Sequence, residues 1–439
     1  MTNGKERDPI STGDLRRPVA AWCLYDWGNS AFPTIILTFV FAPYFTQAVA
    51  ADPVTGTALW GQTLTLSALL IAVLSPFLGA FADKGGRRKP WLGFFSALAC
   101  LATAGLWFVR PMVDDIFFAL ALLVVANLGF ELAIVFYNSM LPSFVPRRLL
   151  GRVSGWGWGV GYAGGLACLA IALIVFVQPE KPFFGLDKDA AEHVRAVAPL
   201  AAIWFACFAL PIFFFTPDQP RTGMPFHKIF RDGGAEVLGT LRMVRRYPSI
   251  AWYLLAHMIY TDGINTLFLF GGIYAAVTFQ MDIVEVLTFG IALNVTAGIG
   301  AAAFAWLDDW IGARRVIAIA LVALTLTATA ILFVQSKDVF WGLGLLLGTF
   351  FGPVQSASRS LMARLAPEGM QSQMFGLYSL TGKATAFVGP ALFSLVVVLT
   401  ESHRAGMATI LPFFLIGLLL LLKVRDPGTE TAKKPSTYQ

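Results

Sequence analysis

The residues of this sequence that could do chemistry are a few ionisable side chains embedded in long apolar stretches. They are Asp26, Glu131, His257, Asp262, Arg359 and Lys383. An ionisable group inside a membrane span costs about 2.5 kcal/mol or more, so it is a candidate functional residue by default. Such groups could bind a proton, a small cation or a charged group of a ligand. The alternative is structural: the carboxylates could hold buried hydrogen bonds or pair with Arg359 and Lys383, and His257 is better explained as a packing residue.

Spacing places further polar residues beside the two aspartates. Each aspartate is followed by polar residues at i+3 and i+4, which share one face of a helix. The two rows are Asp26, Asn29 and Ser30, and Asp262, Asn265 and Thr266. Glu131 lies about ten residues before Pro142, which places it about 15 Å from that helix end at 1.5 Å per residue. A carboxylate at such a depth can bind a proton when desolvated and release it when water enters.

The composition shows which kind of element must position these side chains. Of 439 residues, 57% are hydrophobic and 13% are charged, whereas a soluble domain carries about 25% charged residues. The mean hydropathy is +0.69, so no folding of the chain could cover its surface with polar groups. A soluble enzyme, a nucleic-acid-binding protein and a disordered scaffold are excluded. The chain is a membrane protein.

The apolar stretches predict twelve transmembrane helices, since a span needs about 20 apolar residues. The predicted spans are 19–47, 58–82, 90–110, 115–141, 152–177, 196–216, 249–278, 285–306, 314–335, 338–363, 373–399 and 405–424. A β-barrel is excluded because its strands would be about ten residues long and would alternate. The predicted fold class is an all-α membrane protein.

The distribution of positive charge predicts the orientation. With a cytoplasmic amino terminus, 24 of the 32 Lys and Arg residues fall inside, 6 fall opposite and 2 lie within spans. Cytoplasmic loops are enriched in Lys and Arg. We therefore expect both termini in the cytoplasm, in a bacterial inner membrane. The net charge of +6 reflects this asymmetry and is no sign of a nucleic-acid partner.

The two halves of the chain are a repeat. The matched residues are Asp26 with Asp262, Asp83 with Asp309, Asn138 with Arg359, and Gly155 with Gly376, at offsets of 236, 226, 221 and 221. Two parallel six-helix halves describe the major facilitator architecture. The predicted parts are a tail (1–18), a six-helix bundle (19–216), a linker (217–248), a second six-helix bundle (249–424) and a tail (425–439).

The linker itself shows a helical pattern. Val237, Leu238, Leu241 and Val244 mark one apolar face with arginines opposite. This pattern predicts a helix on the membrane surface, with a solvated linker helix as the alternative.

Narrower motifs resemble one branch of the major facilitators. Gly79-Ala-Phe-Ala-Asp83-Lys-Gly-Gly-Arg87-Arg88-Lys89 resembles the superfamily signature between the second and third helices. The branch is indicated by Tyr25-Asp26-Trp27-Gly28-Asn29-Ser30, Phe136-Tyr137-Asn138 and Gln355-Ser-Ala-Ser-Arg359-Ser360. These resemble the vacuole-effluxer-like branch, relatives of the fungal autophagy protein that exports amino acids from the vacuole. The resemblance spans about residues 20–400.

The resemblance implies a site and a gate. In facilitators the first and seventh helices line a central cavity, so both polar rows are expected to face it. The candidate substrate-binding or coupling residues are Asp26, Asn29, Ser30, Glu131, Tyr137, Asn138, Asp262, Asn265, Thr266, Gln355, Arg359 and Lys383. The candidate gating residues are Gly79, Asp83, Arg87, Arg88 and Asp309. Asp83 is expected to pair with Arg87, or with a neighbouring helix end, while the carrier is open outward.

Small residues predict where the halves touch. The fifth span carries two glycine ladders, Gly155 with Gly159, and Gly157 with Gly161 and Gly165, and the eighth span carries Gly290 and Gly298. Small residues allow close helix packing in lipid. We expect these two spans to form a contact between the halves, with Gly157, Gly161, Gly165, Gly290 and Gly298 as packing residues.

The sequence thus predicts a secondary transporter that moves a small polar organic solute by alternating access. Amino-acid efflux is the choice that the family suggests, with proton coupling through Asp26 and Glu131. The expected partners are the substrate, a proton or other cation, and the lipid bilayer. No metal-ligand spacing, nucleophile elbow or dinucleotide fingerprint occurs in the sequence, so neither an enzyme nor a cofactor is predicted.

Two alternatives remain at this stage. A cation-coupled sugar symporter would share the acidic-plus-Asn motif and the Gly-Arg-Arg loop, although the second span lacks the carboxylates that sodium symporters of that kind use. A facilitator fold could also serve as a sensor or an assembly partner without transport.

Overall fold

The computed structural model describes residues 15–181, 183–223 and 247–425. Within these residues, twelve helical segments are long and apolar enough to cross a membrane. They are Arg16–Val49, Pro53–Gly85, Lys89–Phe108, Val113–Phe144, Arg147–Val177, Glu192–Phe215, Pro248–Phe279, Ile283–Ile311, Ala313–Phe333, Lys337–Leu365, Gln371–Thr400 and His403–Leu421. The twelve predicted spans are confirmed, although most of the helices extend several residues beyond the apolar stretches. The predicted linker helix and both tails lie largely outside the described residues.

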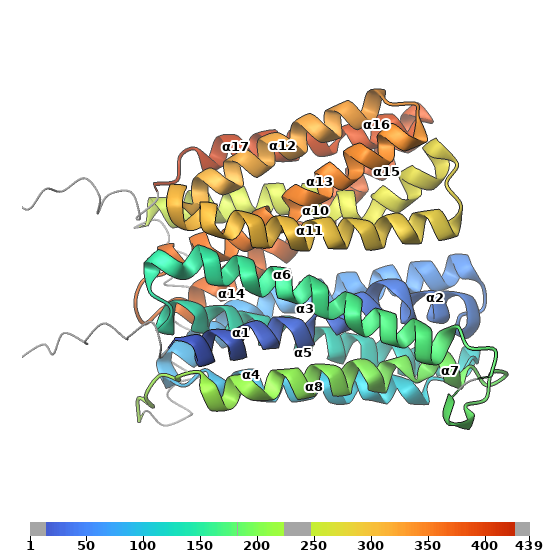
Figure 1. Cartoon of the computed structure of the whole chain (residues 1–439), viewed down its shortest axis with the longest axis horizontal. Helices are drawn as coiled ribbons and strands as arrows, with labels where there is room; N and C mark the ends of the chain where they lie inside the picture. Colours follow the sequence, from blue (N-terminus) through green and yellow to red (C-terminus); the bar gives the residue numbers. More distant parts are fainter. Residues whose placement is uncertain (1–14, 182, 224–246, 426–439) are drawn as a thin grey trace, which may run out of the picture.

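The helices fall into two groups along the chain (Figure 1). The first group contains α1 (Arg16–Asn29), α2 (Phe41–Tyr44), α3 (Pro53–Gly85), α4 (Lys89–Gly105), α5 (Ile116–Phe144), α6 (Leu150–Ile171), α7 (Glu192–Arg195) and α8 (Val197–Phe215). The second contains α10 (Pro248–Phe279), α11 (Ile283–Ile311), α12 (Ala313–Phe333), α13 (Lys337–Leu365), α14 (Gln371–Lys383), α15 (Val388–Thr400), α16 (His403–Ala408) and α17 (Ile410–Leu421).

The most extensive contacts between the groups are those of α3 with α14 and of α6 with α11. Helix α6 also packs against α13, and α5 against α14 and α13. Helix α1 begins and α17 ends at the same end of the bundle, on the left in Figure 1. We call this end the terminal end and the opposite one the far end. Asp83 and Asp309 lie at the terminal end, because each occupies the last turn of a helix, α3 or α11, that runs toward it.

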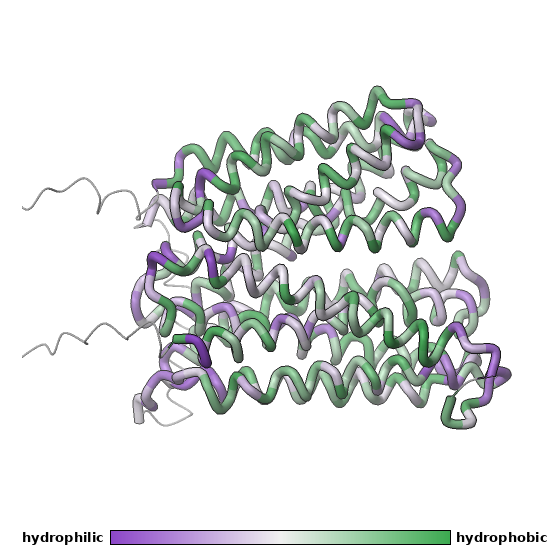
Figure 2. The backbone as a smooth tube through the Cα atoms, in the orientation of Figure 1, coloured by the Kyte–Doolittle hydropathy of each residue, from purple (hydrophilic) through white to green (hydrophobic). Residues whose placement is uncertain are grey.

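The hydropathy of the residues matches a molecule that is surrounded by lipid along its length and by water at its ends. Hydrophilic residues gather at the two ends of the bundle, and hydrophobic residues cover the length of the helices (Figure 2). Large apolar side chains such as Val73, Phe117, Phe214 and Val398 are more than half exposed. In lipid these side chains are solvated, while the helices satisfy their own backbone hydrogen bonds.

Polar residues cap the starts of two helices at the far end, α3 and α11. Asp52 accepts hydrogen bonds from the backbone N–H groups of Val54 and Thr55 at 3.0 Å, and so caps α3. The hydroxyl of Thr55 also donates to this carboxylate, and these bonds lower the pKa of Asp52. Asp282 and Glu285 form a capping box at the start of α11, a pattern that satisfies the free N–H groups of a first turn.

Two spans depart from regular α-helix. The first span contains π-helical stretches at Phe32–Phe39 and Phe45–Val49. Pro33 occupies the second position of the first stretch, where its missing N–H cannot complete the α-helical ladder. The eleventh span is broken between Lys383, where α14 ends, and Val388, where α15 begins. Hydropathy alone predicts both as continuous helices, because it does not register the backbone geometry.

Candidate functional site

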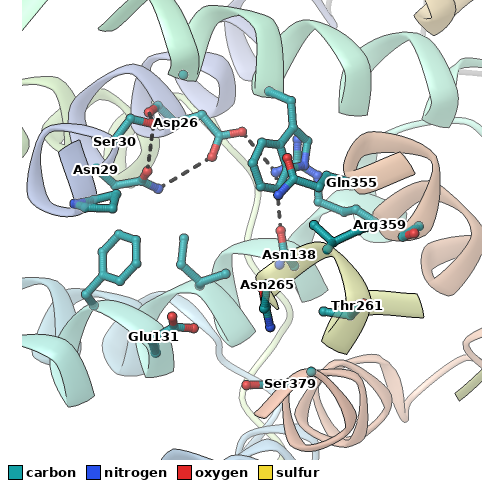
Figure 3. Close-up of a pocket in the computed structure, with 18 of the residues that line it drawn as sticks. Asp26, Asn29, Ser30, Glu131, Asn138, Thr261, Asn265, Gln355, Arg359 and Ser379 are labelled. Atoms are coloured by element: carbon teal, nitrogen blue, oxygen red, sulfur yellow. Dashed lines mark hydrogen bonds and ion pairs between the residues drawn. The ribbon is translucent and has the colours of Figure 1, made fainter. Parts of the chain in front are cut away.

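A cavity of about 540 Å³ lies between the two groups of helices. Its walls come mainly from α1, α5 and α6 of the first group and from α10, α13 and α14 of the second (Figure 3). The candidate residues that line it are Asp26, Asn29, Ser30, Glu131, Asn138, Asn265, Gln355, Arg359 and Lys383. Residues from both groups of helices therefore meet at one site.

An ion pair at the cavity wall joins the two groups. Arg359 Nη1 on α13 lies 2.9 Å from Asp26 Oδ2 on α1. The guanidinium also donates to the hydroxyl and the carbonyl of Ser154 on α6, at 2.9 and 2.7 Å. It stacks over the ring of Trp22, 4.5 Å from the centroid. Arg359 is only 3% exposed, so a residue of the second group is embedded in the first.

A second ion pair crosses the cavity itself. Lys383 Nζ on α14 lies 2.6 Å from Glu131 Oε1 on α5. These side chains are 31% and 19% exposed, whereas those of Arg359 and Asp26 are 4% and 10% exposed. Glu131 and Lys383 are therefore the charges that a ligand or water in the cavity reaches more readily. The sequence leaves open that the carboxylates pair with Arg359 and Lys383. In this structure both Asp26 and Glu131 do so.

Polar residues of the first span surround Asp26. Ser30 Oγ donates to the backbone carbonyl of Asp26 at 2.8 Å, and Asn29 Nδ2 lies 3.5 Å from Asp26 Oδ1. Across the cavity, Gln355 accepts a 2.6 Å hydrogen bond from the hydroxyl of Tyr162. The first polar row thus faces the cavity as the helical spacing predicts.

Three predicted site residues do not line the cavity. Tyr137 stacks between Trp22 and Tyr25, with centroids at 4.4 and 4.6 Å, because the next residue, Asn138, takes the cavity-facing position on α5. Asp262 and Thr266 turn away, toward Gly389 of α15. The expectation that the whole second row faces the cavity is therefore wrong. Only Asn265 does so, because a row at i, i+3 and i+4 spreads over an arc wide enough to meet two neighbours.

Several cavity residues are not among the predicted site residues, namely Tyr162, Tyr260, Tyr378, Ser379 and Asn294. His257, which the sequence indicates as a packing residue, also lines the wall. The histidine also packs as expected, since it stacks on Tyr378 at 4.0 Å and bonds Thr381 at 3.0 Å. The spacing of Ser379 and Lys383, at i and i+4, was a usable signal for the serine. Nothing in the sequence distinguishes the tyrosines from packing aromatics.

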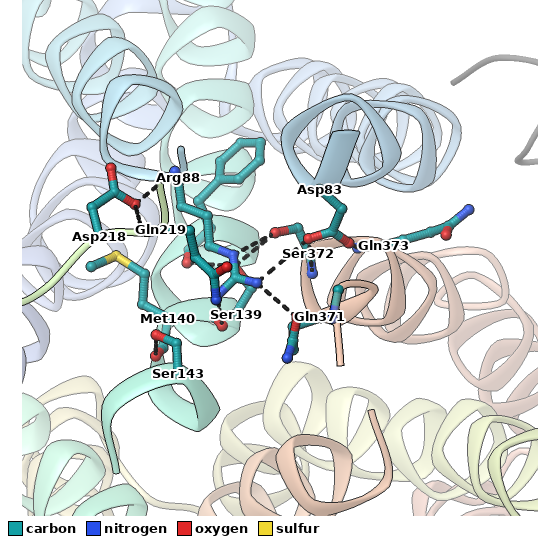
Figure 4. A network of polar contacts seen from close by, with 12 residues as sticks. Asp83, Arg88, Ser139, Met140, Ser143, Asp218, Gln219, Gln371, Ser372 and Gln373 are labelled. Carbon is teal, nitrogen blue, oxygen red and sulfur yellow. Dashed lines mark hydrogen bonds and ion pairs between the residues drawn. The ribbon is translucent and has the colours of Figure 1, made fainter. Parts of the chain in front are cut away.

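The terminal end is closed by a network around Asp83 and Arg88 (Figure 4). Asp83 accepts the backbone N–H groups of Ser372 and Gln373, at 3.0 and 2.8 Å, at the start of α14. Arg88 Nη2 lies 3.6 Å from Asp83 and donates to Gln371 at 2.8 Å. Arg88 Nη1 donates to the carbonyl of Ser139 on α5 at 2.8 Å. Asp83 therefore binds a neighbouring helix end of the other group.

Arg87 is misassigned as a gating residue. Its side chain is exposed at the surface, while the adjacent Arg88 is buried and occupies the position beside Asp83. The sequence could not separate the two, because both follow the Gly-Gly turn.

Asp309 makes the equivalent contact on the other side of the bundle. It accepts the backbone N–H groups of Gly151 and Arg152, at 2.8 and 3.1 Å, at the start of α6. Arg364 Nη2 lies 3.3 Å away, and its other nitrogen pairs with Asp308 at 2.5 Å. Arg152 of α6 is a second cation here, since its Nε lies 3.5 Å from Asp309 Oδ2. The two closures are therefore similar but not identical.

Glycines allow the two helix pairs to meet at this end. A Cβ on Gly79 would overlap the carbonyl of Ser372, and one on Gly376 would overlap that of Ser75. On the other side, a Cβ on Gly155 would lie 2.5 Å from Ala305 Cβ, and one on Gly159 would lie 3.1 Å from Gly298 O. These four glycines allow close packing between the groups.

The predicted packing set is therefore wrong in part. Gly161 and Gly165 face the first span, since a Cβ on them would approach Ser30 and Thr34. A Cβ on Gly157 would approach Asp26 of the first span, and it would also lie 2.9 Å from Arg359 Nη2 of the second group. Gly298 does meet the other group, at Tyr162, and Gly290 approaches Phe39 at 3.7 Å. A ladder read from sequence gives the spacing of small residues but not which neighbour each ladder faces.

Two groups of helices around a shared central cavity are the fold of major facilitator transporters, and solved structures agree. The chain is similar to the proton:xylose symporter XylE (TM-score 0.72, 13% identity, 94% of this chain and 95% of that one). It is also similar to the fucose transporter FucP in the outward conformation (TM-score 0.70, 14% identity, 94% and 99%).

The family is more specific than the fold. Residues 53–150 and 146–431 match the family described as vacuole effluxer Atg22 like, and the chain belongs to that family. It is 26% identical to an uncharacterized MFS-type transporter, YxiO, of Bacillus subtilis, over 95% of this chain and 96% of the relative. It is 24% identical to autophagy-related protein 22 of Kluyveromyces lactis, over 81% and 77%. The protein is thus an integral, multi-pass membrane protein of the major facilitator transporters.

Proposed function

We propose that this protein is a proton-coupled secondary transporter that moves a small polar organic solute through the cavity by alternating access. The observation that carries the proposal is the Glu131–Lys383 ion pair, because it joins the two groups inside the cavity and its carboxylate is accessible. Any motion that separates the groups must break this pair. A carboxylate that loses its cation in a desolvated site takes up a proton.

The charges of the cavity suggest the class of substrate. Its lining holds two carboxylates, Asp26 and Glu131, and two cations, Arg359 and Lys383, which compensate one another. A solute with a net charge would leave that charge uncompensated once the cavity closed, and burying an unpaired charge is costly. A neutral or zwitterionic solute fits this balance. Amino acids or similar metabolites are the proposed substrates, in keeping with the effluxer name of the family.

The distribution of charge suggests the orientation. The loops and helix ends at the terminal end carry Arg87, Arg147, Arg314 and their neighbours, and the positive-inside rule assigns such an end to the cytoplasm. The closures around Asp83 and Asp309 would then be cytoplasmic gates, and the conformation would be open outward. Export requires the opposite state, in which these closures open to admit the solute.

A sugar symporter is the second candidate. The cavity wall is rich in side-chain amides, namely Asn29, Asn138, Asn265, Asn294 and Gln355. Amides both donate and accept hydrogen bonds, as recognition of hydroxyl groups requires. An uncharged polyol would use these groups and leave both ion pairs intact, whereas a zwitterion would compete for Glu131 and Lys383.

One experiment separates these possibilities. The purified protein is reconstituted in proteoliposomes, and uptake of labelled amino acids and labelled sugars is measured with and without a pH gradient. The proposal expects a zwitterionic solute to accumulate when the gradient is imposed. Accumulation of sugars alone would favour the second candidate, and accumulation that follows a sodium gradient would refute proton coupling.

A further inference from the structure

Asp262 is a buried carboxylate that the cavity does not use. It lies 14 residues after the start of α10, about 21 Å along a helix that rises 1.5 Å per residue. The residue is 3% exposed. Its depth and burial mean that an ionised form would need a partner.

The partners of Asp262 are few. Its Oδ2 accepts one long hydrogen bond, 3.3 Å, from the backbone N–H of Gly389. Its Oδ1 is buried and has no hydrogen-bond partner among the described residues. Among the described residues, the other acids at the cavity and the gates, Asp26, Asp83, Asp308, Asp309 and Glu131, each have an arginine or lysine within 4 Å. Within these described ranges, Asp262 has no such ion pair.

The internal repeat explains the missing cation. Asp26 and Asp262 are matched positions, and Asp26 pairs with Arg359 of the opposite group. The residue that matches Arg359 in the first group, 221 positions earlier, is Asn138. At the position where a cation for Asp262 would be expected from the repeat, the chain therefore has the neutral amide of Asn138.

Neighbouring helices do not supply a charge either. Phe413 and Phe414 of α17 are the residues that face Gly263, next to Asp262. On α10 itself, His257 is bound to Thr381 and Tyr260 to Ser358. The cation at the end of α14, Lys383, is paired with Glu131. A proton is the neutralising group that needs no further ligands, whereas a metal cation needs a shell of several oxygen atoms.

Asp262 contacts the part of the eleventh span that follows the break. The first turn of α15 directs the N–H of Gly389 at the carboxylate, and Gly389 packs so closely on Thr266 that a Cβ would overlap its hydroxyl. The turn between Lys383 and Val388 links this contact to the cavity ion pair. Ionised Asp262 would be attracted to the positive helix start, so the neutral and ionised forms favour different positions of α15.

We propose that Asp262 is a second proton-binding site, separate from the cavity, that carries a proton in this conformation and is coupled to the docking of α15. The proposal goes beyond the transport function above and does not depend on which solute the cavity binds. It predicts that the carboxyl group of Asp262 is a neutral acid, while that of Asp26 is an anion held by Arg359.

Infrared spectroscopy of the full chain in lipid nanodiscs tests this directly. The wild type should show the C=O stretch of a protonated carboxylic acid at neutral pH. Asp262→Asn should remove that band, and the matched control Asp26→Asn should leave it in place. A band that survives in Asp262→Asn, or that appears only when sodium is withdrawn, would overturn the proposal.

A second test uses the wild-type chain, so its result does not depend on whether a variant folds. Dicyclohexylcarbodiimide adds to protonated carboxyl groups in apolar surroundings, and peptide mass spectrometry locates the adduct. The proposal expects modification at Asp262 and none at Asp26, with no protection by sodium at fixed pH. Absence of the Asp262 adduct would count against it. Neither measurement involves transport, so their failure would leave the proposed function standing.

Discussion

Asp83 and Asp309 cap helices of the opposite group through matched residues. Asp83 accepts the N–H groups of residues 372 and 373, and Asp309 accepts those of residues 151 and 152. The two pairs of donor residues differ by 221 positions, the same offset that relates Asn138 to Arg359 and Gly155 to Gly376. A carboxylate at a helix start is stabilised by free N–H groups and by the helix dipole. The same kind of contact, an aspartate bound to the start of a helix of the other group, therefore closes the terminal end on both sides.

Asp83→Asn should weaken the first closure and slow transport. The substitution removes the carboxylate beside the buried Arg88, and an uncompensated buried charge costs about 3–5 kcal/mol. We expect normal membrane insertion and an uptake rate at least tenfold lower in proteoliposomes, because the two-state equilibrium shifts toward the opened terminal end. Arg87→Gln is the matched control, since Arg87 is exposed, and it should transport normally. Full activity of Asp83→Asn would refute the gating role.

Gly155→Leu should stop the cycle without unfolding the protein. A Cβ at this position would lie 2.5 Å from Ala305 on α11, so a leucine keeps α6 and α11 apart at the terminal end. Solute counterflow should be lost, because exchange needs both conformations. Gly342→Leu on α13 is the control, since no described residue lies within 4 Å of the position that a Cβ would take there. Equal counterflow in both variants would show that the α6–α11 contact is not rebuilt during transport.

Arg359→Met should destabilise the protein more than removal of both charges does. The single change leaves Asp26 buried without its cation, at a cost of about 3–5 kcal/mol. The double variant Asp26→Asn with Arg359→Met removes the unpaired charge and should recover much of the thermal stability, as a double-mutant cycle in nanodiscs would measure. Additive losses would mean that the 2.9 Å ion pair contributes little to the coupling of the groups.

The sequence predicts the spans, the repeat and the polar row of Asp26, because these depend on hydropathy and local spacing. It offers the pairing of the carboxylates with Arg359 and Lys383 only as an alternative, and it does not say which acid meets which cation. The two pairs, Glu131 with Lys383 and Asp26 with Arg359, join residues 252 and 333 positions apart. Nor does it reveal the break after Lys383 that turns Asp262 toward α15. Helical periodicity states which residues share a face, whereas the neighbour that each face meets is decided by the packing of all twelve spans.

The central claim, that Glu131 carries the transported proton, is tested most directly by Glu131→Gln in proteoliposomes. The glutamine mimics the protonated form, so the conformational exchange remains possible while titration is lost. We expect loss of accumulation driven by a pH gradient and preservation of substrate counterflow, which needs no net proton movement. Loss of counterflow at an unchanged melting temperature would contradict the claim and assign Glu131 to the substrate site.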